Sequence, residues 1–228
     1  MCIRDRHIPV FHMEAGNRSF DWRVPEETNR RIVDHISDVN LVYTEHARQN
    51  LMREGIHPQR VYLTGSPMYE VLEHYRPKIE ASDVLEREGL EAGKFLVVSL
   101  HREENVDSQD RLMLLLKGLD RLASEWGQEV LVSTHPRTRK RLEEGGLPKT
   151  WSDAVRLSKP FGFHDYNKLQ MTATCAISDS GTISEEASIL GFPAITPRDW
   201  IERPEALDAG SVVTVSYTHL TLPTTPYV

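Results

Sequence analysis

The chain has 228 residues and a formal net charge of −7, and its length allows one large domain or two smaller ones. The sequence has no basic stripe of the kind that binds nucleic acid. It also has no apolar run close to the roughly 20 residues that a membrane span needs. Two cysteines without the spacing of a metal site favour a reducing, cytoplasmic setting and no disulfide framework.

The two ends differ in character from the rest of the chain. Residues 1–6 and 215–228 resemble translated sequencing-adaptor read-through, and we exclude both from the fold prediction. On this interpretation residues 7–214 are an internal piece of a longer protein, and Cys175 is its only native cysteine. The alternative is that the second segment is a genuine tail rich in threonine and proline.

Residues 7–67 alternate between strand and helix patterns. Pro25 opens the first helix, because proline suits the first helical position and the acidic residues after it suit the first turn. Such alternation predicts a parallel sheet with helices on its faces. The predicted elements are a strand over 7–13, a helix over 26–36, a strand over 40–43, a helix from its cap at Thr44 to Gly55, and a strand over 60–63.

Residues 68–93 are polar and show no strand pattern. They predict a helix that Pro77 interrupts, followed by a short helix between Ser82 and Gly89. We interpret this segment as the link between two α/β units.

A second alternation fills residues 94–214. Leu112, Leu115, Leu116, Leu119 and Leu122 have nearly helical spacing, which predicts a long amphipathic helix over 107–126. The pattern also predicts a helix around 166–171 and strands over 94–100, 129–134, 155–157, 175–178 and 192–196. The chain as a whole therefore predicts an α/β fold with two units.

The stretch from Cys175 to Glu186 predicts a buried strand, a turn and a helix. Gly181 in the turn has no side chain, so a ligand can approach the backbone closely. The N-terminus of the following helix favours an anion such as a phosphate. The alternative is an ordinary turn in which Ser180 or Thr182 caps the helix.

Four chemically suitable groups each follow a predicted strand in the second unit. They are His101, His135, Ser180-Gly181 and Glu202-Arg203. The carboxyl ends of parallel strands share one edge of an open sheet, where ligands bind. Two histidines, a glycine turn at a helix N-terminus and an arginine on that edge predict a site for a diphosphate. Glu14 likewise follows a strand, in the first unit.

Two carboxylates of the first unit are candidates for acid/base chemistry. Glu14 and Glu26, joined by Asp21, suit proton transfer on a sugar nucleotide. The alternative is that Glu26 only balances the helix dipole and pairs with Arg30. The sequence offers no glycine fingerprint for a dinucleotide, no phosphate-loop lysine and no convincing metal spacing, so neither a metal nor a redox cofactor is predicted.

Six short motifs follow one another along residues 7–214. They are His12-Met13-Glu14-Ala15-Gly16, Pro25-Glu26-Glu27-Thr28-Asn29-Arg30, Thr64-Gly65-Ser66, His101-Arg102-Glu103, Ser178-Asp179-Ser180-Gly181 with Glu185-Glu186, and Glu202-Arg203-Pro204-Glu205. In their combination and order the chain closely resembles the family of non-hydrolysing UDP-N-acetylglucosamine 2-epimerases.

The resemblance implies two Rossmann-like domains in the arrangement of GT-B glycosyltransferases, with UDP in the cleft. Residues 7–67 would be the remaining part of a truncated first domain, and residues 94–214 the UDP-binding domain. It further implies elimination of UDP to give a 2-acetamidoglucal, and re-addition of UDP after C2 is protonated on the other face. No cofactor is implied, and a homodimer is the family expectation.

The resemblance also implies roles for individual residues. Glu14 and Glu26 would be the acid/base carboxylates, and His101 a third catalytic residue. The substrate-binding residues would be Arg30, His101, His135, Ser180, Gly181, Glu186, Arg203 and Tyr166. Of these, Glu186 would take the ribose hydroxyls and Tyr166 would stack on uracil.

The chain also departs from the family. An opening strand, a basic loop and a catalytic aspartate expected ahead of His12 are absent, so we expect the polypeptide as it stands to be inactive. Thr182 and Ser184 stand where the commonest members have Gly and Gln. Residues 17–22 are also unlike those members. Thr182, Ser184 and this segment suggest, as an alternative substrate, a 2-acetamido-2,6-dideoxy-hexose nucleotide of the L-talose to L-fucose type. An alternative of another class is a GT-B glycosyltransferase or a non-catalytic nucleotide-sugar binder.

Overall fold

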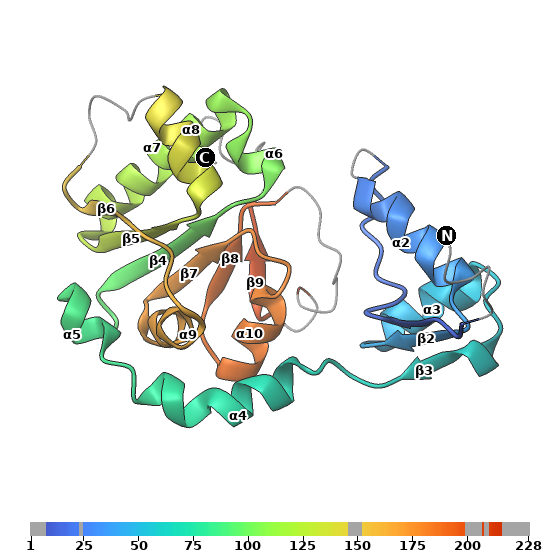
Figure 1. Cartoon of the computed structure of the whole chain (residues 1–228). Helices are drawn as coiled ribbons and strands as arrows, with labels where there is room; N and C mark the ends of the chain where they lie inside the picture. The colour runs from blue at the N-terminus through green and yellow to red at the C-terminus, as the bar shows by residue number, and fades with distance from the viewer. Residues whose placement is uncertain (1–7, 23–24, 146–151, 199–206, 208–209, 216–228) are drawn as a thin grey trace, which may run out of the picture. The chain divides into compact units, whose positions relative to one another are not determined.

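The computed structural model describes residues 8–22, 25–145, 152–198, 207 and 210–215. Its contacts divide the chain into two compact units (Figure 1). The described part of the first unit is residues 8–22 and 25–71, and residues 72–145, 152–198, 207 and 210–215 belong to the second.

The first unit is a three-stranded parallel sheet with helices. The strands lie in the order β1 (Phe11–Met13), β2 (Val39–Val42) and β3 (Val61–Leu63). The helices are α2 (Pro25–Ile36), α3 (Glu45–Arg53) and the short 3-10 helix η1 (Pro58–Arg60). Thr44 caps α3 as predicted, since its side chain accepts a hydrogen bond from the backbone N–H of Ala47.

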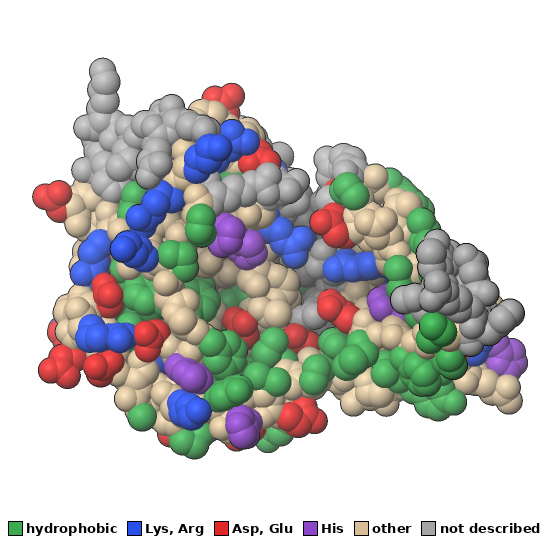
Figure 2. Space-filling model, in the orientation of Figure 1, with side chains coloured by type: hydrophobic (Ala, Val, Ile, Leu, Met, Phe, Trp, Pro, Cys, Tyr) green, Lys and Arg blue, Asp and Glu red, His purple; other side chains and the backbone are tan. Residues whose placement is uncertain are grey.

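The two faces of this sheet differ in burial. On one face Val42 and Val61 are buried against Ala47 and Leu51 of α3. The alternate residues on the other face include Phe11, Met13 and Tyr62, each more than half exposed. Figure 2 shows hydrophobic side chains gathered over β3. Parallel sheets are ordinarily covered on both faces, so the described part of this unit leaves one apolar face uncovered, with β1 at its edge.

Gly16, in the turn after β1, is held against α3. Its φ is +78°, and a Cβ there would lie 2.2 Å from the backbone oxygen of Ala47. We expect Gly16→Ala to destabilise the first unit by about 3 kcal/mol, from left-handed strain plus a clash that backbone cannot easily relieve. Gly65→Ala is the matched control, because Gly65 has a φ of +76° but open space around it. Its expected cost is about 1 kcal/mol, from strain alone. Urea unfolding followed by circular dichroism measures both costs, and equal values would contradict the packing argument.

Two helices follow β3, and the boundary between the units lies within the first of them. They are α4 (Met68–Glu80) and α5 (Val84–Glu88). The predicted interruption at Pro77 is wrong, because α4 continues through this residue. Leu72 and Ile79 are fully buried on either side of it, so packing holds the helix together past the missing N–H donor.

The second unit is a six-stranded, entirely parallel sheet in the order β6-β5-β4-β7-β8-β9. The chain enters at β4 in the middle, runs outward to β6, and returns to build the other half from β7 to β9. The strand order therefore reverses between β4 and β7, as in doubly wound nucleotide-binding folds. The strands are β4 (Phe95–Leu100), β5 (Glu129–Thr134), β6 (Val155–Ser158), β7 (Cys175–Ser178), β8 (Ala194–Thr196) and β9 (Val212–Thr214).

Helices cover both faces of this sheet (Figure 1). Leu96 and Val98 of β4 pack in one hydrophobic core with α7, while Phe95 and Val97 pack in a second core with α9 and α10. Of the predicted leucine stripe on α7, all but the half-buried Leu122 are buried. The helices are α6 (Glu103–Val106), α7 (Gln109–Trp126), α8 (Pro136–Gly145), α9 (Phe163–Thr172) and α10 (Ile183–Leu190). The predicted α/β class with parallel sheets in both units is confirmed.

Across the described ranges, no helix combines the length and apolar character needed to cross a bilayer.

Candidate active site

A pocket of about 290 Å³ opens at the carboxyl edge of the second sheet. It is formed by residues at the ends of β4 and β5, by the segment leading into α9, and by α10. Its lining is Ser99, His101, Ser133, His135, Pro160, Phe161, Phe163, Tyr166, Asn167 and Glu186. Four of the residues predicted from the sequence are thus brought together, namely His101, His135, Tyr166 and Glu186.

The two histidines come together because their strands are neighbours. His101 follows β4 and His135 follows β5, and the two strands are paired in register. Their ring centroids are 6.3 Å apart. Each imidazole can donate to an anion in the pocket from a ring nitrogen that carries a proton; for His101, whose Nδ1 faces Asp179, that requires protons on both ring nitrogens.

Asp179, directly after β7, fixes the position of His101. Its fully buried carboxylate accepts hydrogen bonds from the backbone N–H groups of His101 and Arg102 and from Asn105 Nδ2, at 2.9–3.1 Å. His101 Nδ1 lies 3.0 Å from the same carboxylate. Burial alone would raise the pKa of Asp179, but the hydrogen bonds from His101 and Asn105 outweigh it and lower that pKa. Asp179 is therefore ionised at neutral pH and orients His101.

Glu186 is oriented by two donors from different elements. Thr182 Oγ1 donates to one carboxylate oxygen at 2.7 Å, and Gln170 Nε2 donates to the other at 2.9 Å. The hydroxyl of Ser180 lies 2.9 Å from that of Thr182, so the turn that contains Ser180 and Gly181 is linked to Glu186. Both oxygens of Glu186 keep further lone pairs that can accept from ligand hydroxyl groups.

Tyr166 supplies an aromatic ring with a permanently protonated hydroxyl. Burial, and next the nearby carboxylate of Glu186, raise the pKa of Tyr166 strongly. The residue lies in α9 beside Phe163 and Asn167 in the pocket lining. Its ring can stack on a planar group, and its hydroxyl can only act as a neutral donor or acceptor.

The remaining described candidates belong to the first unit. Glu14 lies directly after β1 and accepts a 3.1 Å hydrogen bond from Asn17 Nδ2. Glu26 is exposed in the first turn of α2, and Arg30 is half-buried one turn later on the same helix. The sequence suggested an ion pair of Glu26 and Arg30. The pair on α2 lies one residue further along, where Arg31 contacts Glu27 at 2.8 Å. Arg203 lies outside the described residues.

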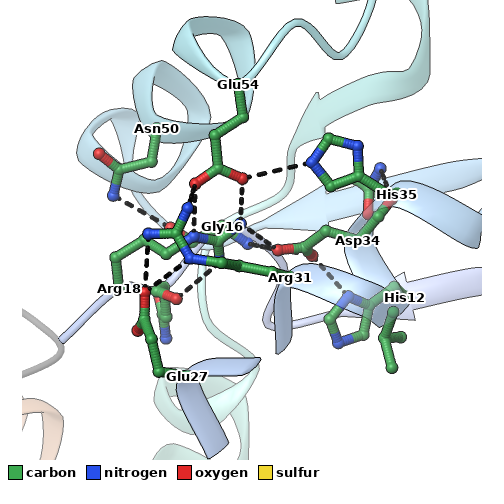
Figure 3. Close-up of polar contacts among 12 residues, drawn as sticks. His12, Gly16, Arg18, Glu27, Arg31, Asp34, His35, Asn50 and Glu54 are labelled. Atoms are coloured by element: carbon green, nitrogen blue, oxygen red, sulfur yellow. Dashed lines mark hydrogen bonds and ion pairs between the residues drawn. The ribbon is translucent and has the colours of Figure 1, made fainter. Parts of the chain in front are cut away.

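A buried cluster of charged side chains in the first unit was not predicted from the sequence (Figure 3). Its centre is Arg18 and Asp34, whose side chains are both 0% exposed and lie 2.7 Å apart. The signal in the sequence that could have revealed this cluster is the helical spacing of charged residues along α2. Glu27, Arg31 and Asp34 are spaced by four and three residues, so the face of α2 that would normally be apolar in a core-facing helix is charged.

Within the described part of the chain, no group of three or more histidine, cysteine, aspartate or glutamate side chains is placed to hold a metal ion. The residues of the pocket instead suit a ligand with a planar ring, hydroxyl groups and negative charge.

Comparison with known proteins gives one consistent result. The family model described as UDP-N-acetylglucosamine 2-epimerase matches residues 2–222. A curated UDP-N-acetylglucosamine 2-epimerase of Methanocaldococcus jannaschii is 36% identical over 213 residues, which cover 91% of this chain and 58% of that protein.

Two solved structures have similar folds. The UDP-N-acetylglucosamine 2-epimerase of Rickettsia bellii has a TM-score of 0.85 and 48% identity, over 94% of this chain and 56% of that one. The Methanocaldococcus jannaschii enzyme in complex with UDP-GlcNAc and UDP also has a TM-score of 0.85, with 34% identity over 94% of this chain and 60% of that one. This chain thus spans little more than half the length of these proteins. The GT-B-type Rossmann class predicted from the sequence is confirmed, and the chain belongs to the UDP-N-acetylglucosamine 2-epimerase family.

Proposed function

We propose that this chain is part of a non-hydrolysing epimerase that interconverts UDP-GlcNAc and UDP-ManNAc for the synthesis of cell-surface polysaccharide. The observation that carries the proposal is the pocket of the second unit, where His101, His135, Tyr166 and Glu186 line one cavity. Its chemistry suits a nucleoside diphosphate, and a relative of known structure is described in complex with UDP-GlcNAc and UDP.

In this proposal residues of the pocket, together with others outside its lining, bind different parts of the nucleotide. Tyr166 stacks on the uracil, and Glu186 accepts from the ribose hydroxyls. The diphosphate binds at the turn of Ser180 and Gly181, with the two histidines and Arg203 as further donors. A diphosphate so held is also a better leaving group, because donors stabilise the charge that develops when its bond to C1 breaks.

The first unit supplies the proton chemistry. Glu14 and Glu26 are the proposed acid/base pair, and Arg30 helps to hold the sugar. One carboxylate removes the C2 proton as the C1–O bond breaks, which releases UDP and leaves a 2-acetamidoglucal. The reverse addition, with a proton delivered to the other face of C2, gives the epimer. Each step balances without an oxidant, a reductant or a metal.

The comparisons favour the GlcNAc substrate over the 6-deoxy-hexose nucleotide. A glycosyltransferase or a passive binder would also bind UDP, but neither has a use for a pair of carboxylates at C2. The homodimer remains a prediction.

Calorimetric titration of the 228-residue chain tests the nucleotide site. We expect it to bind UDP through the second unit, and Tyr166→Ala to weaken binding at least about tenfold through lost stacking. Tyr69→Ala is the matched control, since Tyr69 is exposed on α4 outside the pocket. An unchanged affinity of Tyr166→Ala would contradict the assigned uracil site. We expect no epimerisation by this chain alone, and turnover would overturn that expectation.

Incubation of the full-length protein with UDP-GlcNAc in D₂O tests the reaction class. Deuterium at C2 together with UDP-ManNAc establishes epimerisation. UDP binding without any exchange at C2 would instead indicate a transferase or a binding protein.

A further inference from the structure

Glu14 has an unusual backbone conformation. Its φ is +62°, in the left-handed region that residues with a side chain seldom adopt. Such strain persists only where the surroundings over-determine the backbone, and it is concentrated at functional sites.

The segment after Glu14 is fastened mainly by side chains of α2 (Figure 3). The Asp34 carboxylate accepts the backbone N–H of Gly16, at 3.3 and 3.4 Å from its two oxygens. Glu27, one residue from Glu26, accepts the backbone N–H and the hydroxyl of Ser19 at 2.9 and 3.2 Å. Both carboxylates are completely buried.

Arg18 joins these contacts into one network. It lies 2.7 Å from Asp34, donates to Glu54 at 2.6 and 2.8 Å, and donates to its neighbouring carbonyl at Asn17. Burial alone would lower the pKa of Arg18, but Glu54 and Asp34 outweigh it and raise that pKa. Arg31 continues the network from Glu27 to Glu54 at 2.7–2.9 Å.

On one side the network contacts the segment at Gly16 through Asp34 and at Ser19 through Glu27, while Arg18 belongs to both the network and the segment. On the other side Asn50 of α3 donates to the Gly16 carbonyl at 3.1 Å, and Ala47 closes off the space beside Gly16. The segment of residues 15–19 is therefore held by side chains of α2 on one side and by α3 on the other. Since α2 also carries Glu26, a fixed segment fixes the two carboxylates relative to each other.

We propose that Asp34, Glu27 and Arg18 are positioning residues for Glu14. They hold its carboxylate, through the backbone of residues 15–19, at a set position relative to Glu26. This inference rests on the proposed epimerase function, in which both carboxylates must face C2 correctly. Shifts of about 1 Å in such a group can cost on the order of 10²-fold in rate.

The kinetic test uses Asp34→Asn in the full-length protein. We expect kcat to fall on the order of 10²-fold, while KM and the Kd of UDP change less than about threefold, because the nucleotide site lies in the second unit. In a Glu14→Gln background the same substitution should have little further effect, since no positioned carboxylate remains. Independent effects that multiply would overturn the proposal.

Two further variants distinguish loss of positioning from a general loss of folding. Glu27→Gln keeps an acceptor for Ser19 but loses its charge towards Arg31, and it should lower kcat less than Asp34→Asn. Glu45→Gln is the matched control, because the exposed pair of Glu45 and Arg48 lies on α3 away from the segment. We expect it to leave kcat unchanged.

Amide hydrogen exchange in the 228-residue chain separates this proposal from the proposed function. Asp34→Asn should speed exchange at Gly16 at least about tenfold, and Glu27→Gln should do so at Ser19. Fast exchange at both amides in the unsubstituted chain would overturn the network's role whatever the enzyme does. Slow exchange together with a full-length protein that lacks epimerase activity would overturn the function and leave the fixed segment standing.

Discussion

Replacing Glu14 by glutamine in the full-length protein is expected to lower kcat about 10³-fold, which lies within the contribution of a positioned acid or base. Glutamine has nearly the same shape and can still accept from Asn17, but it cannot take up the C2 proton. The Kd of UDP should change less than about threefold, because Glu14 is not among the residues that line the pocket proposed for the nucleotide. Stopped assays by NMR measure both epimerisation and C2 exchange.

The control for this substitution is Glu70→Gln, an exposed carboxylate on α4. It should leave kcat unchanged. Glu26→Gln should also lower kcat strongly, and the C2 exchange of the two epimers separates the two carboxylates. The carboxylate that acts as base on one face of C2 should be needed most for C2 exchange of the epimer whose C2 proton lies on that face. A Glu14→Gln variant with near-normal kcat would remove Glu14 from the mechanism, although UDP binding would be unaffected.

The fold could be predicted largely because its signals are local. Parallel strands in a doubly wound sheet are buried on both faces and appear as short apolar runs, as in β4 and β5. The helix α7 follows from its leucine spacing, with a serine cap before it and Gly127 after it. These features need no knowledge of distant contacts.

Elements that depend on contacts with residues far away in the sequence were predicted less well. β9 has only three residues, and it forms by pairing with β8 rather than from its own pattern. The helix through Pro77 likewise depends on the burial of Leu72 and Ile79. β1 is shorter than predicted, since Pro9 lacks a donor and the N–H of Val10 is bonded to the Asp38 side chain.

The pocket was predictable because the order of the strands determines where the residues that follow them lie in the fold. His101 and His135 follow neighbouring strands, so their meeting at one sheet edge follows from the strand order. The partners of these residues were not predictable in this way. The position of Asp179 directly after β7 places it at the same sheet edge, but its contacts are with groups 74 to 78 residues earlier in the chain, and no local pattern says which donors it meets.

The charged face of α2 shows a different limit. The sequence suggested a pair of Glu26 and Arg30, whereas the pair in the structure is the fully buried Glu27 with the partly exposed Arg31. Both pairs have the same spacing, so spacing alone cannot say which faces the interior. Only the third member, Asp34, would have identified the buried face, and charged residues there contradict the usual apolar pattern.

Asp179→Ala is expected to cost the second unit about 3–5 kcal/mol, because it leaves buried donors of His101, Arg102 and Asn105 without their acceptor. The control is Asp153→Ala, an exposed aspartate before β6, with an expected change within about 0.5 kcal/mol. Urea unfolding at several pH values measures both changes.

The pH dependence of this cost has a definite sign. The pKa of Asp179 is lowered from its ordinary value of 3.8, so its stabilisation is complete above that value and is lost as the pH falls through the folded pKa. The difference between wild type and Asp179→Ala should therefore be constant from about pH 5 to 8 and shrink below pH 3.8. The Asp153→Ala control should show no such trend. A difference that grew on acidification would mean that burial, rather than the donors around it, determines the ionisation of Asp179. His101 would then lack the fixed anion that orients it in the pocket proposed for the diphosphate.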